Sequence, residues 1–254
     1  MPAERPEIDS QWYEQAFGAL YPAIYAHRTI EAAGPEAAFA AARLSLGPAM
    51  RLLDLCCGTG RHLVHLSGRV AQAVGLDYSP ELLSIAADTL ARHSAPAALV
   101  RADMRAIPFV DAFDVVTNFF TSFGYFIPDD ENLAVARGVA RALKPGGRFL
   151  IDYFSGPYTE RNLVPCSERT HNQYTITETR WIDTAAGRVN KETVVASGAR
   201  IVCRLGESVR MYGLDEFIAL LAAGGLATDE VFGNYSGAAY DQSQPRMIVV
   251  GHKV

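Results

Sequence analysis

The residues best suited to binding chemistry form a short glycine-containing segment near position 58. The run Leu52–Leu55 is apolar apart from Asp54, and it leads through two cysteines into Gly58-Thr59-Gly60. Glycines suit a turn in which the backbone bends sharply and leaves room for a ligand. A helix that follows such a turn directs its N–H groups and positive dipole end at whatever lies over the turn. By itself, the pattern is also typical of a plain strand-to-helix turn.

Two acids follow at positions that suit a nucleoside. Asp77 ends the apolar run Val74–Leu76, seventeen positions after Gly60. A carboxylate at a strand tip can accept two hydrogen bonds from a ribose diol, although Asp77 could instead cap a helix beginning near Pro80. Asp103 ends another strand-like run, where a carboxylate can accept from an adenine amino group. The alternative for Asp103 is a surface acid in a turn.

The same segment argues against two common classes of nucleotide site. A dinucleotide site in the G-x-G-x-x-G frame would need glycine at position 63, which is Leu63. A phosphate-binding P-loop would need Gly-Lys followed by Ser or Thr, and this is absent from the sequence. We therefore expect a nucleoside without a pyrophosphate, and a nicotinamide-dependent oxidoreductase is disfavoured.

The elements that must position these residues alternate between strand-like and helix-like patterns. Strand-like runs occupy residues 51–56, 70–76, 98–102, 113–119 and 148–154, and helical patterns occupy 61–66, 80–93 and 131–143. Buried strands that alternate with helices predict a parallel sheet. The Lys144–Gly147 segment predicts a stop and a turn after the last of these helices.

The flanking regions differ from this core. Residues 1–50 are Ala-rich, and Gly18 and Pro22 favour two short helices in their first half. Residues 155–210 predict an antiparallel insertion with strands at 171–182, 188–196 and 200–204. Residues 211–254 predict a closing helix at 214–223 and strands at 227–232 and 247–252, so we expect one domain over residues 1–254.

Composition excludes several functional classes. The 254 residues carry a net charge of −5 with no Lys/Arg run, so we expect no nucleic-acid partner. No apolar stretch is long enough to span a bilayer, and the charged N-terminus does not resemble a secretory signal. The four cysteines show no CxxC spacing. We therefore expect a cytoplasmic protein without membrane partners.

At this point the motifs resemble those of class I S-adenosylmethionine-dependent methyltransferases. The resemblance rests, in this order and spacing, on LLDLCCGTGRH, VGLDYSPELL, RADM, FDVVTNFFTSFGYF and LKPGGRFLID. It covers residues 10–154 well and residues 211–254 more loosely. It implies an α/β fold with a Rossmann-like, mostly parallel seven-stranded sheet, helices on both faces, an N-terminal helical lid and the antiparallel β insertion. One departure is Cys56, which stands where the family often has glycine.

The resemblance also implies S-adenosyl-L-methionine as cofactor and roles for particular residues. Gly58 and Gly60 would pass under its methionine part, Asp54 would anchor the loop, and Cys56 would contribute its backbone. Its adenosine part would meet Asp77 at the ribose hydroxyls, Tyr78 on the adenine face, and Asp103 and Met104 at the adenine edge. The remaining predicted cofactor residues are Asn118 and Phe119 beside the sulfonium, and Arg28, assisted by Tyr21, at the methionine carboxylate.

The methyl acceptor and any base are less determined. The implied acceptor is a small molecule with an N, O or C nucleophile. The alternatives are a tRNA or protein methyltransferase of the same fold, or a cofactor-binding protein without turnover. Aromatic residues from Phe119 to Phe126, with Tyr153 and Phe154, could line its pocket, and the insertion could cover it or form a homodimer. No base stands out among His27, Tyr125, Asp152, Tyr153 and His171, and no metal is expected, because His62 and His65 lack a third ligand in the sequence.

Overall fold

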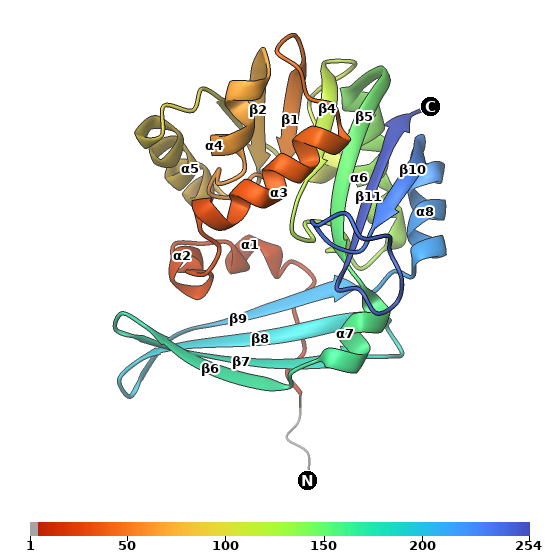
Figure 1. Cartoon of the computed structure of the whole chain (residues 1–254). Coiled ribbons are helices and arrows are strands. Elements are labelled where there is room, and N and C mark those ends of the chain that lie inside the picture. The colour runs from red at the N-terminus through yellow and green to blue at the C-terminus, as the bar shows by residue number, and fades with distance from the viewer. Residues whose placement is uncertain (1–4) are drawn as a thin grey trace.

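Two β-sheets with a helical segment between them make up the architecture of the computed structural model, which describes residues 5–254 (Figure 1). The larger sheet has seven strands in the order β10-β11-β5-β4-β1-β2-β3. The second sheet is the antiparallel insertion. No helix among the described residues is long and apolar enough to cross a membrane.

The larger sheet is mostly parallel, as the sequence predicts. Strands β1 to β5 run parallel to one another, and β11 is antiparallel to both β5 and β10. The chain leaves β1 on one side toward β2 and later returns on the other side as β4, and ligands bind at such a switch point in open α/β sheets. The bounds are β1 (Arg51–Leu55), β2 (Gln72–Asp77), β3 (Ala98–Arg101), β4 (Phe113–Asn118), β5 (Leu143–Phe154), β10 (Leu226–Phe232) and β11 (Arg246–Lys253).

Helices cover both faces of this sheet because successive strand residues point to opposite sides. Leu52 of β1 packs in a cluster with residues of α3 and α4, whereas Leu53 packs in a second cluster with residues of α6 and α8. The bounds are α3 (Ile30–Arg43), α4 (Leu63–Leu66), α5 (Pro80–Arg92), α6 (Asp129–Ala142) and α8 (Leu214–Ala223), with short 3-10 turns at η1 (Ser67–Arg69) and η2 (Met104–Ala106).

The N-terminal segment lies between the two sheets (Figure 1). It forms two short helices, α1 (Tyr13–Ala16) and α2 (Tyr21–Ile24), which confirms the prediction from Gly18 and Pro22. Trp12, Tyr13 and Ala16 belong to the core cluster of the larger sheet. Ile24 and Tyr25 pack instead against Ile176 and Val195 of the second sheet.

The second sheet is antiparallel, with the strand order β6-β7-β8-β9. Its strands are β6 (Cys166–His171), β7 (Tyr174–Asp183), β8 (Arg188–Ser197) and β9 (Arg200–Arg210). The strand predicted over residues 171–182 is confirmed as β7 except at its start, because Asn172 takes a φ of 52° and turns the chain back into β6, which was not predicted. The turns that join β7 to β8 and β8 to β9 contain Gly187 and Gly198, both with a positive φ.

Two local features differ from the sequence prediction. Residues 156–162 form α7 (Gly156–Asn162), which the sequence analysis missed although Ser155 and Pro157 are typical of a helix start. Helix α6 ends at Ala142, one residue before the predicted end, and β5 begins at Leu143, five residues before the predicted strand. The predicted turn over Lys144–Gly147 lies inside β5: Gly146 takes a φ of 71°, and the register against β4 passes directly from Leu143 to Arg148.

Candidate functional site

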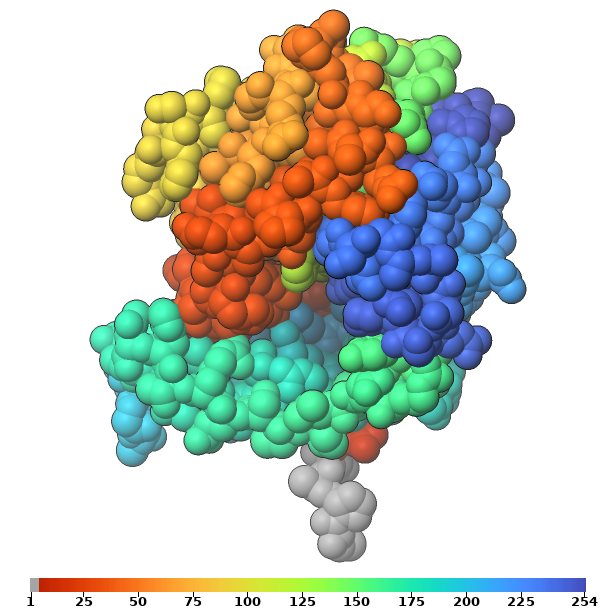
Figure 2. Space-filling view, in the orientation of Figure 1, coloured from red at the N-terminus to blue at the C-terminus, as the bar shows by residue number. Residues whose placement is uncertain are grey.

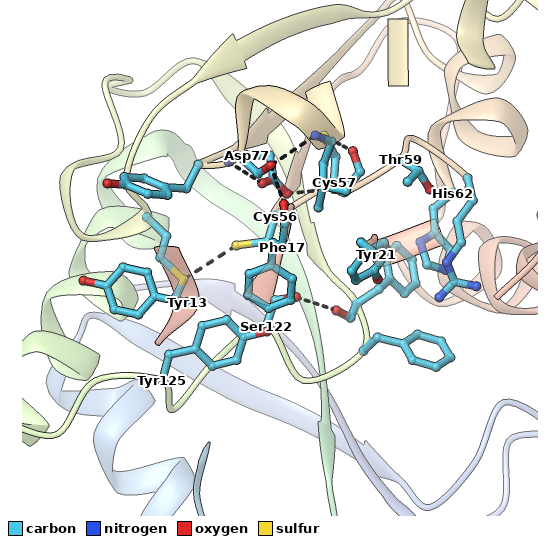
Figure 3. Close-up of a pocket in the computed structure, with 18 of the residues that line it drawn as sticks. Tyr13, Phe17, Tyr21, Cys56, Cys57, Thr59, His62, Asp77, Ser122 and Tyr125 are labelled. Carbon is cyan, nitrogen blue, oxygen red and sulfur yellow. Dashed lines mark hydrogen bonds between the residues drawn. The ribbon is translucent and has the colours of Figure 1, made fainter. Parts of the chain in front are cut away.

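A cavity lies where the glycine-containing loop after β1, the ends of β2 and β4, and the N-terminal helices meet (Figure 3). Asp77 lies toward one end of the cavity, and Tyr21 and His62 lie toward the other. Nine of the predicted cofactor residues line it, whereas Asp54, Gly60 and Asn118 lie just outside the lining. The lining is Tyr13, Phe17, Tyr21, Arg28, Cys56, Cys57, Gly58, Thr59, Arg61, His62, Asp77, Tyr78, Ser79, Leu82, Ala102, Asp103, Met104, Phe119, Phe120, Ser122, Tyr125 and Phe126.

The loop after β1 has the backbone conformation that favours glycine. Gly58 and Gly60 have φ angles of 56° and 77°, and a Cβ built on Gly58 would meet no atom within 4 Å, so the chain leaves open space there. Cys56 also has a positive φ, of 58°. This explains why glycine is common at its position and why cysteine is unusual. Its Sγ lies 3.6 Å from the Sδ of Met104.

Asp77 is buried at the tip of β2 and faces this loop. Its Oδ2 accepts from the N–H of Gly58 at 2.8 Å and its Oδ1 from the N–H of Ser79 at 2.9 Å. Burial raises the pKa of Asp77 against the lowering effect of these backbone donors. The N-cap of α5 is Ser79, whose hydroxyl accepts from the N–H of Leu82. The alternative role of Asp77 as the cap is therefore wrong.

The predicted adenine-edge residues lie on the same side of the cavity. Met104 is buried, and Asp103 caps η2. The Asp103 carboxylate accepts from the Arg105 guanidinium at 2.6 Å, and Arg105 also pairs with Glu131. Burial alone would raise the pKa of Asp103, but the Arg105 hydrogen bonds outweigh it and the pKa is lowered. Tyr78, 37% exposed, lies at the rim of the cavity.

At the other end of the cavity, Arg28 presents an unmatched positive charge. Its Nη1 donates to the Tyr21 hydroxyl at 3.0 Å, while its buried Nε has no partner in the described chain. Its guanidinium lies over the ring of Tyr25, 4.0 Å from the centroid. No carboxylate of residues 5–254 forms an ion pair with Arg28, so this cation is available to an anionic ligand.

Two acceptor atoms behind the glycine loop lack donors. Asp54 accepts from Thr117 Oγ1 at 2.9 Å through Oδ1, but its Oδ2 is unpartnered. Asn118 donates to the carbonyl of Leu55 at 3.0 Å, but its Oδ1 is unpartnered. Burial raises the pKa of Asp54 to about 7. Buried acceptors without donors are rare in folded proteins and call for a donor from outside the chain.

Sequence analysis missed Arg61, His62 and Glu36 as site residues. Oε2 of Glu36, on α3, lies 3.2 Å from Arg61 Nη1 and 2.7 Å from His62 Nε2. Burial, and secondarily Arg61, lowers the pKa of His62 well below its ordinary value. The neutral ring stacks on Phe119 at 3.9 Å. The position of Arg61 and His62 directly after Gly60 was the available signal, whereas nothing in the sequence links them to Glu36.

The aromatic residues expected near the acceptor divide into two groups. Phe119, Phe120, Tyr125 and Phe126 line the cavity, whereas Phe123 and Tyr153 pack against Phe217 in the core. Figure 2 shows the surface hollowed between α3, the second sheet and the segment after β10, with atoms of the yellow-green segment that includes residue 120 inside.

The candidate bases are mostly committed elsewhere or lie outside the cavity lining. Asp152 forms an ion pair with Arg246 at 2.7 Å, and Tyr153 donates to the carbonyl of Arg210. His27 is exposed on the lid, and His171 ends β6, and neither belongs to the residues that line the cavity. Tyr125 does line it, and burial raises the pKa of its hydroxyl well above the ordinary value.

Comparison with known proteins agrees with this geometry. A family model described as a methyltransferase domain matches residues 52–147. The cypemycin N-terminal methyltransferase of a Streptomyces species is 30% identical over 203 residues, which cover 78% of this chain and 81% of that protein. A dTDP-3-amino-3,6-dideoxy-alpha-D-glucopyranose N,N-dimethyltransferase of Streptomyces fradiae is 28% identical over 197 residues, 74% of each chain.

Solved structures share the whole architecture. An S-adenosylmethionine-dependent methyltransferase from Clostridium acetobutylicum superposes with a TM-score of 0.78 at 18% identity, covering 92% of this chain and 96% of the other. CalS10, an amino pentose methyltransferase from Micromonospora echinaspora solved with S-adenosylmethionine bound, gives a TM-score of 0.67 at 22% identity and covers 99% of both chains. The insertion and the lid are therefore parts of a shared fold.

Proposed function

Because this chain belongs to the class I S-adenosylmethionine-dependent methyltransferases, we propose that it methylates the nitrogen of a small-molecule or peptide amine. The observation that carries the proposal is the absence of an available base among the described residues that line the cavity. The two carboxylates in that lining are Asp77, held by backbone N–H groups, and Asp103, held by Arg105. The one imidazole is His62, which is a weak base because burial lowers its pKa well below the ordinary value, and its Nε2 already lies 2.7 Å from Glu36 Oε2.

The unpaired polar groups of the cavity fit the amino-acid end of S-adenosylmethionine. Arg28 offers a guanidinium without a carboxylate, which suits the methionine carboxylate. The Asp54 carboxylate and the Asn118 amide offer buried oxygens without donors, which suit the α-ammonium, directly or through water. The cavity thus offers a cation for the carboxylate and hydrogen-bond acceptors for the ammonium of the methionine part.

The other predicted residues would hold the adenosine part. Asp77 would exchange its backbone donors for the ribose hydroxyls, Tyr78 would pack on the adenine face, and Asp103 and Met104 would lie at its edge. Gly58 and Gly60 would leave room for the chain between the two ends, and Phe119 would lie beside the sulfur. When bound, the cofactor supplies a methyl group on a positively charged sulfur.

The acceptor chemistry follows from what the cavity residues can do. An alcohol or carbon acceptor must lose a proton before or during attack, which requires a base. An α-amine has an ordinary pKa of about 8, so a usable fraction carries a lone pair near neutral pH. The cavity rings of Phe17, Phe120 and Tyr125 would exclude water and align the nitrogen with the methyl group for in-line displacement.

The activities of two relatives also support an amine acceptor. One acts on the N-terminus of cypemycin, and another is an N,N-dimethyltransferase of an amino sugar. Both names describe transfer to an amine nitrogen. The hollow of Figure 2 would admit the remainder of such an acceptor while its amine enters the cavity.

The deciding experiment offers methyl-labelled cofactor with pairs of acceptors that differ only in the nucleophile. The panel holds amino-sugar nucleotides and short peptides, their hydroxyl counterparts, and tRNA and folded protein. We expect label on amine nitrogen, read by mass spectrometry. The Asp77→Ala variant should bind the cofactor about 1–3 kcal/mol more weakly and serve as a low-activity control.

Other outcomes would contradict the proposal. Label only on a hydroxyl or carbon atom would show that a base acts in the cavity. Label only on tRNA or folded protein would favour a macromolecular acceptor, which the net charge of −5 disfavours for nucleic acid. Cofactor binding without any transfer would favour a sensor of the cofactor.

We also propose a homodimer through the insertion, a cytoplasmic location, and one functional domain over residues 1–254. The dimer is supported by Ile201 and Val202, which are 50% and 41% exposed at the start of β9, an edge strand of the second sheet. Light scattering should give twice the chain mass, and Ile201→Glu should halve it. A monomer mass for the unmodified protein would exclude this assembly.

A further inference from the structure

We propose that Arg246 and Arg188 are positioning residues that fix the loop after β4, residues 119–126, as the platform for the methyl acceptor. Neither arginine belongs to the residues that line the cavity, but Phe119, Phe120, Ser122, Tyr125 and Phe126 of this loop do. The inference concerns the methyl-transfer step. It rests on the proposed acceptor end of the cavity, but not on the acceptor being an amine.

The first half of the loop is held in an unfavourable conformation. Phe120 and Thr121 have φ angles of 58° and 61°, so two consecutive residues with a Cβ are left-handed. Such residues persist only where the surrounding structure over-determines them, and they cluster at functional sites. The strain turns the Phe120 ring to the cavity, where the guanidinium of Arg61 lies 4.3 Å from its centroid.

Hydrogen bonds with Asp152 and Arg246 stabilise this unfavourable backbone conformation. The fully buried Asp152 accepts from the N–H of Phe120 at 2.9 Å through its carboxylate and from the N–H of Thr121 at 2.8 Å through its carbonyl. Arg246 donates to the Asp152 carboxylate at 2.7 Å and to the Thr121 hydroxyl at 3.1 Å. The C-terminal strand β11 therefore fixes two loop residues through one ion pair.

Arg188 holds the second half of the loop from the insertion. Its guanidinium donates to the carbonyls of Phe126 at 3.1 Å, Tyr125 at 2.9 Å and Gly124 at 3.3 Å. It is 5% exposed and forms no ion pair with a carboxylate of residues 5–254. A buried arginine bound only to neutral groups pays a desolvation cost that the hydrogen bonds must offset. The burial of Arg188 is therefore better explained by a need to fix the loop after β4 than by general stabilisation of the fold.

Gly124 lies in the loop beyond the residues bound by Arg246, is the first of those bound by Arg188, and has little room for a side chain. Its φ is 78°, and a Cβ there would lie 2.9 Å from the Tyr153 hydroxyl. Its carbonyl also accepts from the N–H of Arg210 in β9 at 2.8 Å. The loop is thus pinned at both ends by strands outside the cofactor-binding half, β11 and β8. A displacement of about 1 Å at a reacting centre can cost about a hundredfold in rate.

The test uses full-length Arg246→Gln and Arg188→Lys with Arg92→Gln as control, since Arg92 lies on the exposed side of α5. We expect the cofactor Kd from calorimetry to stay within about twofold, while kcat/KM for the acceptor falls at least about tenfold, chiefly through kcat. The acceptor is whichever compound takes the labelled methyl group. A kcat/KM within twofold of the control in both variants would overturn the proposal, as would an equal loss of cofactor affinity.

A rescue experiment distinguishes loss of the strained loop conformation from general destabilisation of the fold. Thr121→Gly in the Arg246→Gln background should recover at least about threefold in kcat, because glycine adopts the left-handed conformation at low cost. Asn172→Gly, a positive-φ position in the second sheet, is the matched control and should recover nothing. No recovery by Thr121→Gly would overturn the role of strain.

A second readout needs no acceptor, so the proposal can fail independently of the proposed function. Trp12 lies 4.7 Å from the Tyr125 ring, measured between centroids, and Trp181 is the other tryptophan. In a Trp181→Phe background, Arg188→Lys should shift the Trp12 emission relative to Arg92→Gln. Emission equal to that of the control would show that Arg188 does not position this loop.

Discussion

Asp54 gives the folded protein a pH-dependent stability at the level of one residue. Its pKa is about 7 when buried, far above the ordinary value of about 3.9. Between these values the folded state binds more protons than the unfolded state, so the stability of the cofactor-free protein falls as pH rises through this window. The loss is on the order of 4 kcal/mol.

Urea unfolding at pH values below and above 7 measures this effect. Asp54→Asn should flatten the pH dependence, because an amide does not titrate and still accepts from Thr117. Equal slopes for the variant and the unmodified protein would assign the dependence to other groups.

Arg28 should matter for the charge and the shape of its side chain. Arg28→Lys keeps the charge but loses the fork and the stacking on Tyr25, and Arg28→Ala loses everything. We expect cofactor binding to weaken by about 1 kcal/mol in the lysine variant and by about 2–3 kcal/mol in the alanine variant. Calorimetry with S-adenosylmethionine measures both. If only the acceptor KM changed, Arg28 would belong to the acceptor site.

At the level of elements, the lid is attached to the insertion through Tyr25. Its hydroxyl donates to Glu207 at 2.5 Å and accepts from Lys191 at 2.5 Å, while Lys191 and Glu207 also pair directly at 2.7 Å. Tyr25→Phe leaves the ion pair but removes the bridge. We expect about 1–3 kcal/mol less stability and faster amide exchange over residues 20–28, measured by hydrogen exchange and urea unfolding.

Tyr158→Phe is a suitable control for the lid, since its hydroxyl makes no hydrogen bond within the described chain. If Tyr25→Phe left exchange over residues 20–28 at the control value, the lid would be held by Ile24 packing alone.

The elements show which features a sequence can predict. The strands β1 to β4 were predictable because each is a short apolar run, such as Leu52-Leu53 in β1. These runs are bounded by glycine, by proline or by segments with a helical pattern. The turn at Asn172, which separates β6 from β7, was not predictable. Thr and Glu residues alternate on both sides of it, and the turn contains no glycine. The start of β5 at Leu143 was missed because Pro145 and Gly146 favour a turn. Gly146 does take a φ of 71°, and the registers against β4 and β11 give no partner to residues 144–147.

The site was predictable where chemistry and chain position coincide. Gly58, Asp77 and Met104 follow strands in order, so one sheet edge brings them together. The pairing of His62 with Glu36, and the contacts of Arg188 and Arg246 with the loop after β4, join residues 26 or more positions apart. Such contacts depend on how helices and sheets pack, which no local pattern encodes.

For the whole molecule, the lid position predicts coupling between the two sheets. Tyr21 and Arg28 face the cavity, while Ile24 and Tyr25 pack on the second sheet. Saturating S-adenosylmethionine, at about 100 times its Kd, should add about 2.7 kcal/mol of stability. Hydrogen exchange should slow in β7 and β8 as well as in residues 51–126. Protection confined to residues 51–126 would show that the insertion is not coupled to cofactor binding.

The place of β11 between β5 and β10 bears on how the protein acquires its structure. Phe154 pairs with Arg246, so one apolar edge of β5 stays open until a strand far along the chain arrives. Pairings this distant slow folding, and an open edge is a template for association with other chains. We therefore expect refolding from denaturant to be slow and its yield to fall with protein concentration. A chaperone that shields the β5 edge should restore the yield.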